Sequence, residues 1–109
     1  MTQREFVAVY IMTNKRYGTL YTGVTSNLMG RIRKHRNGEI EGFTKKHGLV
    51  RLVWFEPHET ITGAIRREKQ VKRYTRDFKT NLIERDNPHW DDLYEDMLKA
   101  SGWGFKLPE

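Results

Sequence analysis

The stretch FVAVYIMTNKRYGTLYTGV, residues 6–24, predicts the centre of the fold. Residues 6–12 form a continuous apolar, β-branched and aromatic run, which is typical of a buried strand. Turn-forming residues follow at 13–18, and residues 19–24 have the character of a second short strand. The pair predicts a β-hairpin, and that hairpin would bring two phenols, Tyr10 and Tyr21, close together.

Further elements are expected around this hairpin. The pattern predicts strands at 6–12, 19–24 and 50–57, and helices at 27–37, 61–73, 75–85 and 90–98. Ser26 or Asn27, and later Thr60 or Thr62, can cap helices, while the glycine-rich segment 38–48 is expected to be a loop with a basic tip. The fold class is therefore α/β, a small three-stranded antiparallel or mixed sheet flanked by helices in the order β-β-α-β-α-α-α.

Composition limits the classes of protein to which the chain can belong. Its 109 residues fit one domain, with a core at about 6–94 and a C-terminal helix and tail to 109. The absence of cysteine excludes disulfides and thiolate metal sites and favours a reducing compartment, so the cytoplasm is the expected location. No apolar run reaches the length of a membrane span, and the N-terminus does not resemble a signal peptide.

The positive charge is concentrated in one part of the chain. The net charge is +6, with an excess of Lys and Arg over residues 28–80 and an excess of Asp and Glu over residues 81–109. This distribution suggests a face for a polyanion such as nucleic acid, although a generically basic protein would have the same net charge.

Glu68 breaks the pattern of its helix. It lies four residues after Ala64 and three before Val71, within the apolar stripe. A carboxylate that faces a core is costly unless it is paired or binds a metal. Glu68 is therefore either the partner of a buried arginine or a metal-binding or catalytic carboxylate.

Arg31 and His35 lie four residues apart on the preceding helix and point the same way. Three of the candidate residues also have an ordinary structural interpretation. His35 would be a boundary histidine, and Tyr10 and Tyr21 would be core aromatics with satisfied hydroxyls. There is no glycine-rich phosphate loop, paired metal-ligand motif or serine nucleophile elbow, which weighs against an ATPase, a zinc enzyme and a serine hydrolase.

Taken in order, these segments resemble the GIY-YIG endonucleases, in particular the small stand-alone members. Ala8-Val9-Tyr10 and Tyr21-Thr22-Gly23 stand where the family has its two signature tripeptides, with Ala8 in place of Gly and Thr22 in place of Ile. TSNLMGRIRKHRNG matches the family's arginine and histidine helix, EGFTKKHG its basic loop, AIRREKQVKR the segment with the metal-binding glutamate, and LIERDNPHWDDL its closing segment.

The resemblance implies a catalytic set and one divalent metal. The implied catalytic residues are Tyr10, Tyr21, Arg31, His35 and Glu68, with Asn87 as a further possible site residue. Glu68 would hold Mg²⁺ or Mn²⁺, hard ions that prefer carboxylate and water. Tyr10 would orient or deprotonate the attacking water with the help of nearby cations, Arg31 would stabilise phosphate charge, and His35 would relay or accept a proton.

The implied substrate is nucleic acid, DNA more than RNA, with a role in repair or recombination. Candidates for backbone contacts are Lys45, Lys46, Arg66, Arg67, Lys69, Lys72, Arg73 and Arg76. Such contacts are salt-dependent and weakly specific. Two alternatives remain: a nucleic-acid-binding module with this fold but little catalysis, and a protein that uses the acidic 90–98 helix for a partner or for self-association.

Overall fold

The hairpin predicted from residues 6–24 forms the centre of the fold. The computed structural model describes residues 6–40 and 42–101, so the tail expected at 102–109 lies outside the described residues. Strand β1 (Ala8–Thr13) pairs antiparallel with β2 (Leu20–Thr25) on one side and with β3 (Arg51–Pro57) on the other. The sheet order is β2-β1-β3, so the sheet is purely antiparallel, and β2 is an edge strand.

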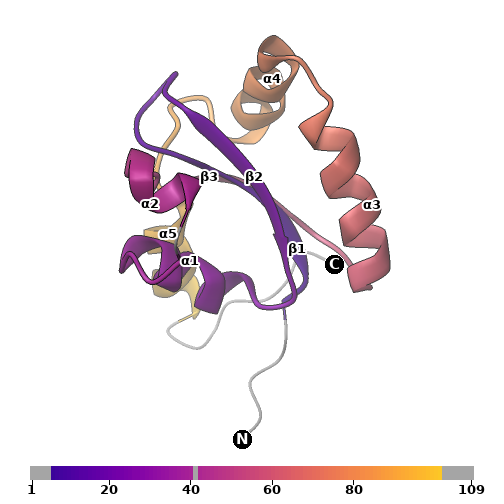
Figure 1. Ribbon diagram of the computed structural model, residues 1–109, viewed down its shortest axis with the longest axis horizontal. Helices are drawn as coiled ribbons and strands as arrows, with labels where there is room; N and C mark the ends of the chain where they lie inside the picture. The colour runs from indigo at the N-terminus through magenta and orange to yellow at the C-terminus, as the bar shows by residue number, and fades with distance from the viewer. Residues whose placement is uncertain (1–5, 41, 102–109) are drawn as a thin grey trace, which may run out of the picture.

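Helices cover both faces of this sheet (Figure 1). They are α1 (Leu28–Arg36), α2 (Phe43–His47), α3 (Ile61–Lys72), α4 (Arg76–Asp86) and α5 (Leu93–Ser101). One face lies under α1, α2 and α5, and the other lies under α3 and α4. No helix within the described ranges is long and apolar enough to cross a membrane.

The two cores follow from the alternation of side chains along β1. Tyr10 and Met12 pack with Leu28 and Ile32 of α1, whereas Val9 and Ile11 pack on the α3 side. Every residue of β1 is buried, as expected for a central strand with helices on both faces. The side-chain oxygens of Asn27, Thr60 and Thr75 accept hydrogen bonds from backbone N–H groups in the first turns of α1, α3 and α4.

Two expectations need correction. The segment 38–48 is not only a loop, because its second half forms α2 between Gly42 (φ 111°) and Gly48 (φ 66°). Five residues are too few for a helix that forms through propensity alone, so tertiary contacts must stabilise it. The last helix begins at Leu93 and not at 90, because Trp90 has φ 59° and packs in the core on the α3 side.

Candidate active site

The antiparallel register of β1 and β2 places the two tyrosines together. Tyr10 lies opposite Gly23, and Met12 lies opposite Tyr21, so both phenols are on the face that α1 covers. The centroids of the two rings are 6.2 Å apart at an interplanar angle of 48°. Tyr10 is almost fully buried, whereas Tyr21 is partly exposed.

Gly23 makes room for the Tyr10 ring on the edge strand. A Cβ atom at position 23 would lie 2.6 Å from both Cζ and the hydroxyl oxygen of Tyr10. That separation is well inside van der Waals contact. The second signature glycine therefore lets the Tyr10 phenol lie across the backbone of β2 with its hydroxyl at the edge of the sheet.

His35 reaches the phenols from α1 and is itself held by α2. Its Nε2 atom lies 2.9 Å from the Tyr10 hydroxyl, and its Nδ1 atom lies 2.9 Å from Thr44 Oγ1. Only 4% of His35 is exposed. The imidazole is thus fixed at both nitrogens, which suits a residue that passes a proton in one direction. Nothing in the sequence pattern singles out Thr44.

Burial keeps both members of this pair neutral at pH 7. Desolvation, followed by the charge of the neighbouring Tyr21, raises the pKa of Tyr10 above its usual value, and the Arg31 guanidinium opposes the shift only in part. Desolvation and then Arg31 lower the pKa of His35 to about 4. The Arg31 guanidinium therefore acts on the pKa of Tyr10 in the expected direction, but burial raises that pKa by more than Arg31 lowers it.

Arg31 and Glu68 act on this pair from two different elements. Arg31 is exposed on α1, and its charge influences the pKa of both Tyr10 and His35. Glu68 comes from α3, is only 9% exposed, and raises the pKa of Tyr10 through its charge. Its Oε2 atom pairs with Lys72 Nζ at 2.7 Å, so its partner is a half-exposed lysine and not a buried arginine.

The Glu68 carboxylate, whose charge acts on Tyr10, fits one hard cation that keeps most of its waters. Among the described residues there is no group of three His, Cys, Asp or Glu side chains that could hold a metal. A single carboxylate is sufficient for Mg²⁺ or Mn²⁺, which usually keep several waters and bind the phosphate of a substrate. Because Lys72 is 53% exposed on its side chain, its ammonium group stays in contact with water when a divalent ion takes its place at the carboxylate.

The predicted phosphate-contacting cations divide into two kinds. Arg67 donates to Glu56 of β3, to Gln70 and to Tyr74, and Arg76 donates to the backbone carbonyls of Tyr17 and Gly18. These two hold elements together. The others are exposed: Lys45, Lys46, Arg66, Lys69, Lys72 and Arg73.

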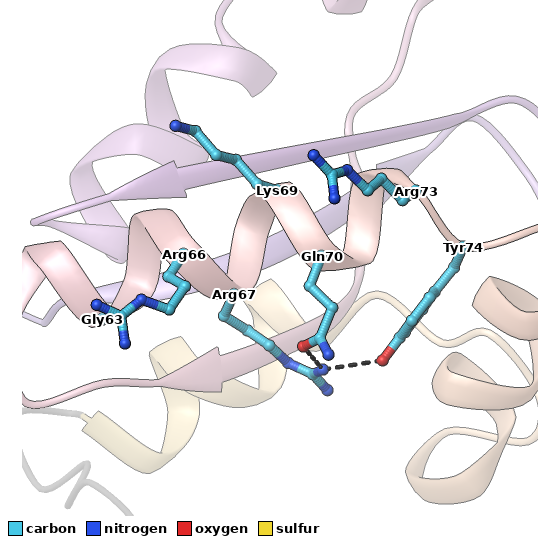
Figure 2. A pocket seen from close by; sticks show the side chains of 7 residues that line it. All are labelled: Gly63, Arg66, Arg67, Lys69, Gln70, Arg73 and Tyr74. Carbon is cyan, nitrogen blue, oxygen red and sulfur yellow. Dashed lines mark hydrogen bonds between the residues drawn. The ribbon is translucent and has the colours of Figure 1, made fainter.

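An open hollow of about 590 Å³ runs along the outer side of α3. Figure 2 shows that Arg67, Gln70 and Tyr74 point toward one another, while Lys69 and Arg73 extend from another side of the helix. The hollow is therefore a basic surface of α3 and is distinct from the buried Tyr10–His35 pair, which does not line it.

Asn87 does not lie with the candidate catalytic residues around Tyr10 and His35. Its side chain is buried and bonds to the carbonyl of Val53 in β3 and to both backbone groups of Asp91. β3 is the edge strand opposite β2. The geometry gives Asn87 a structural task, the connection of the end of α4 to the sheet.

Comparisons with known proteins support the fold and indicate the family. Residues 6–81 match the family model of the GIY-YIG catalytic domain. Proteins named UPF0213 from Staphylococcus aureus strains Mu3 and Mu50 are 40% identical over 67 residues, which cover 62% of this chain and 82% of theirs. The fold is also similar to the solution NMR structure of a UPF0213 protein from Bacillus halodurans, with a TM-score of 0.50, 30% identity, and coverage of 80% of this chain and 92% of that one.

Proposed function

Because the chain belongs to the GIY-YIG family of catalytic domains, we propose that it is a divalent-metal-dependent endonuclease acting on nucleic acid, DNA more than RNA, with little sequence specificity. Membership of this family implies nuclease activity. The observation that carries the proposal is the hydrogen bond between Tyr10 and His35, two neutral and buried groups. The charges of Arg31 and Glu68 both influence the pKa of Tyr10. A protein that only binds nucleic acid has no need of such a pair.

In the proposed reaction, a water oxygen attacks phosphorus, the bond from phosphorus to the leaving oxygen breaks, and that oxygen takes up a proton from solvent to become a hydroxyl group. Tyr10 is protonated at neutral pH, so it can take a proton from the water only while passing its own proton to His35 Nε2, 2.9 Å away. His35 can accept it because its Nε2 lone pair is available when Nδ1–H donates to Thr44 Oγ1.

The remaining residues stabilise charge. Arg31 neutralises the charge that develops on the phosphate, and Tyr21 positions the phosphate or the water. Glu68 would hold Mg²⁺ or Mn²⁺, which when bound supplies positive charge at the phosphate. Exposed Lys and Arg side chains of α2 and α3 would contact the nucleic acid backbone without reading sequence.

The proposed nuclease would act in a reducing compartment. The cysteine-free sequence favours a cytoplasmic role, and DNA repair or recombination is the expected use of such a nuclease. A protein partner or self-association through the 90–98 segment stays a prediction. Within the chain, Asp92 and Glu95 of that segment are already ion-paired with Arg36 of α1.

The test is cleavage of labelled single-stranded, duplex, branched and RNA substrates with Mg²⁺ or Mn²⁺. Tyr10→Phe and Glu68→Gln should each lower the rate by about a hundredfold or more, as expected for the loss of a proton-transfer group or a metal ligand. Tyr17→Phe and Glu59→Gln alter exposed residues away from the pair and should leave the rate unchanged. If the protein binds these substrates in a salt-sensitive way but cuts none of them, it is a binding module with a nuclease fold.

A further inference from the structure

An aromatic row leads from the buried pair to the surface of α2. The Tyr21 ring is 5.8 Å from the His35 ring and 6.4 Å from the Phe43 ring, and the planes of Tyr21 and Phe43 are only 25° from parallel. Phe43 in turn lies 4.4 Å from His47, one turn later on the same helix. The row therefore begins at the candidate catalytic residues and ends in solvent, where Phe43 is 46% exposed.

The structure fixes Phe43 in this exposed position. The next residue, Thr44, is buried and bonded to His35, and Leu49 is fully buried and donates its N–H to the Thr44 carbonyl. Because these contacts hold α2 in place, Phe43 cannot turn inward without breaking them. Because Phe43 lies against the partly exposed Tyr21 ring, the two rings form a continuous aromatic surface beside the candidate site.

The surroundings of Phe43 indicate what would bind there. Lys45 and Lys46 follow it on α2 and are exposed, so the ring stands in a positively charged segment. Aromatic rings among cations form the usual surface for unpaired nucleotides, because every base has a π-face and every nucleotide carries a phosphate. In a duplex the faces of the bases are covered by their neighbours, so only an unstacked base offers one.

We propose that Phe43 and His47 form a stacking platform for an unpaired nucleobase next to the phosphate that is cut. The inference rests on the proposed function, because it takes the scissile phosphate to lie at Tyr10, Tyr21 and Arg31. With the Tyr21 and Phe43 rings 6.4 Å apart, a strand whose phosphate lies at Tyr21 has an adjoining base within reach of Phe43. The substrate class that follows is a single strand, or a junction or end with unpaired nucleotides.

The experiment measures binding in EDTA, so that cleavage does not interfere. The probes are a short DNA single strand with one 2-aminopurine and the same strand paired to its complement. The variants are Phe43→Leu, which removes the π-face but keeps apolar bulk, and Phe43→Trp, which restores a face. Phe78→Leu is the matched control, because Phe78 is 60% exposed on α4 and contacts Tyr74 in a tilted arrangement.

Phe43→Leu should weaken single-strand binding by about 5- to 150-fold, which corresponds to the loss of one base–aromatic stack. Duplex binding should hardly change, Phe43→Trp should bind like the wild type, and Phe78→Leu should have no effect. The wild type should also quench 2-aminopurine fluorescence, and Phe43→Leu should not.

The platform and the nuclease proposal can fail separately. If Phe43→Leu binds both probes like the wild type, or loses affinity for both equally, the platform is overturned, even when cleavage is normal. If the wild type cuts nothing but Phe43→Leu still loses single-strand binding and quenching, the platform stands and the nuclease proposal falls. If the wild type binds neither probe, the platform is overturned as well.

Discussion

The neutral pair of Tyr10 and His35 shows how burial, more than neighbouring charge, sets the protonation of a site. Both groups are close to Arg31, whose charge favours phenolate and disfavours imidazolium, yet desolvation is the largest cause of both pKa shifts. One consequence is that, in the proposed reaction, the first proton shift would be from Tyr10 to His35. A second consequence is that the stability of the protein depends on pH through His35.

His35→Gln should destabilise the protein less at pH 4 than at pH 7. The pKa of His35 falls from 6.5 in the unfolded chain to about 4 in the folded protein, so the unfolded state binds the proton more readily between these values. The stability that the neutral imidazole provides is complete above pH 6.5 and is lost as the pH falls toward 4. The difference should be about 2–3 kcal/mol.

Urea unfolding of both proteins at the two pH values measures this difference. His89→Gln is the control, because His89 is exposed and its replacement should change the stability little. An equal loss of stability in His35→Gln at pH 4 and pH 7 would mean that His35 titrates normally in the folded protein.

Gly23→Ala should disable the site with only a moderate loss of stability. The added methyl group would lie 2.6 Å from the Tyr10 hydroxyl, so the ring must move away from His35. We expect about 1–3 kcal/mol of destabilisation from overpacking and a large fall in the cleavage rate. Gly63→Ala on α3 is the comparison, because its nearest neighbour is a side-chain oxygen at 3.2 Å. Normal cleavage by Gly23→Ala would show that the position of the Tyr10 ring is not critical.

Thr22→Val should stabilise the protein. The Thr22 hydroxyl is buried and, among the residues that the structure describes, has no hydrogen-bond partner. Valine has nearly the same shape without the polar group, so the unfolding free energy should rise by about 1–3 kcal/mol. Chemical denaturation measures the change, and a lower stability would show that the hydroxyl has a partner in solution, such as a water molecule.

At the scale of elements, the strands and long helices could be predicted because their patterns are local. The apolar run at 6–12 and the caps at Asn27 and Thr60 follow from short-range rules, and so does the i, i+4 spacing of Arg31 and His35. Helix α2 could not be predicted, because it depends on the contact of Thr44 with His35 across the fold. For the same reason, the sequence does not predict the exposed position of Phe43 or the protonation state of Tyr10. Both depend on tertiary contacts.

Asn87 belongs to this scale, because it joins α4 to β3. Asn87→Ala would leave the buried Val53 carbonyl and the Asp91 backbone groups without three hydrogen bonds. We expect about 2–4 kcal/mol of destabilisation, with little change in the cleavage rate of the folded protein. Thermal unfolding and cleavage assays at low temperature separate the two effects. Asn81→Ala, at an exposed position of α4, should change neither, and loss of cleavage by stably folded Asn87→Ala would instead place Asn87 in the site.

At the scale of the whole molecule, ion pairs within the protein determine which of its cations remain available to a nucleic acid. The acidic segment after α4 lies against α1, where Asp92 and Glu95 pair with Arg36. Separately, Arg67 of α3 pairs with Glu56 of β3. These arginines are largely neutralised by partners within the protein. Among the exposed cations, those of α3 form a surface that a phosphate backbone can reach, on the helix that also carries Glu68.

Nucleic-acid binding should therefore be strongly salt-dependent and should depend on that surface of α3. Each phosphate that a cation neutralises releases a counterion, so binding weakens as the salt concentration rises. The double variant Lys69→Gln with Arg73→Gln should therefore lower the slope of log Kd against log salt by about one for each cation removed. The change should be the same for single-stranded and duplex substrates. Anisotropy titrations over a range of salt concentrations give the slopes. Arg85→Gln, which alters an exposed cation paired with Asp86 at the end of α4, should leave the slope unchanged. An unchanged slope in the double variant would mean that the phosphates of the nucleic acid do not contact Lys69 and Arg73 of α3. The phosphate contacts would then be sought on α2, beside the proposed Phe43 platform.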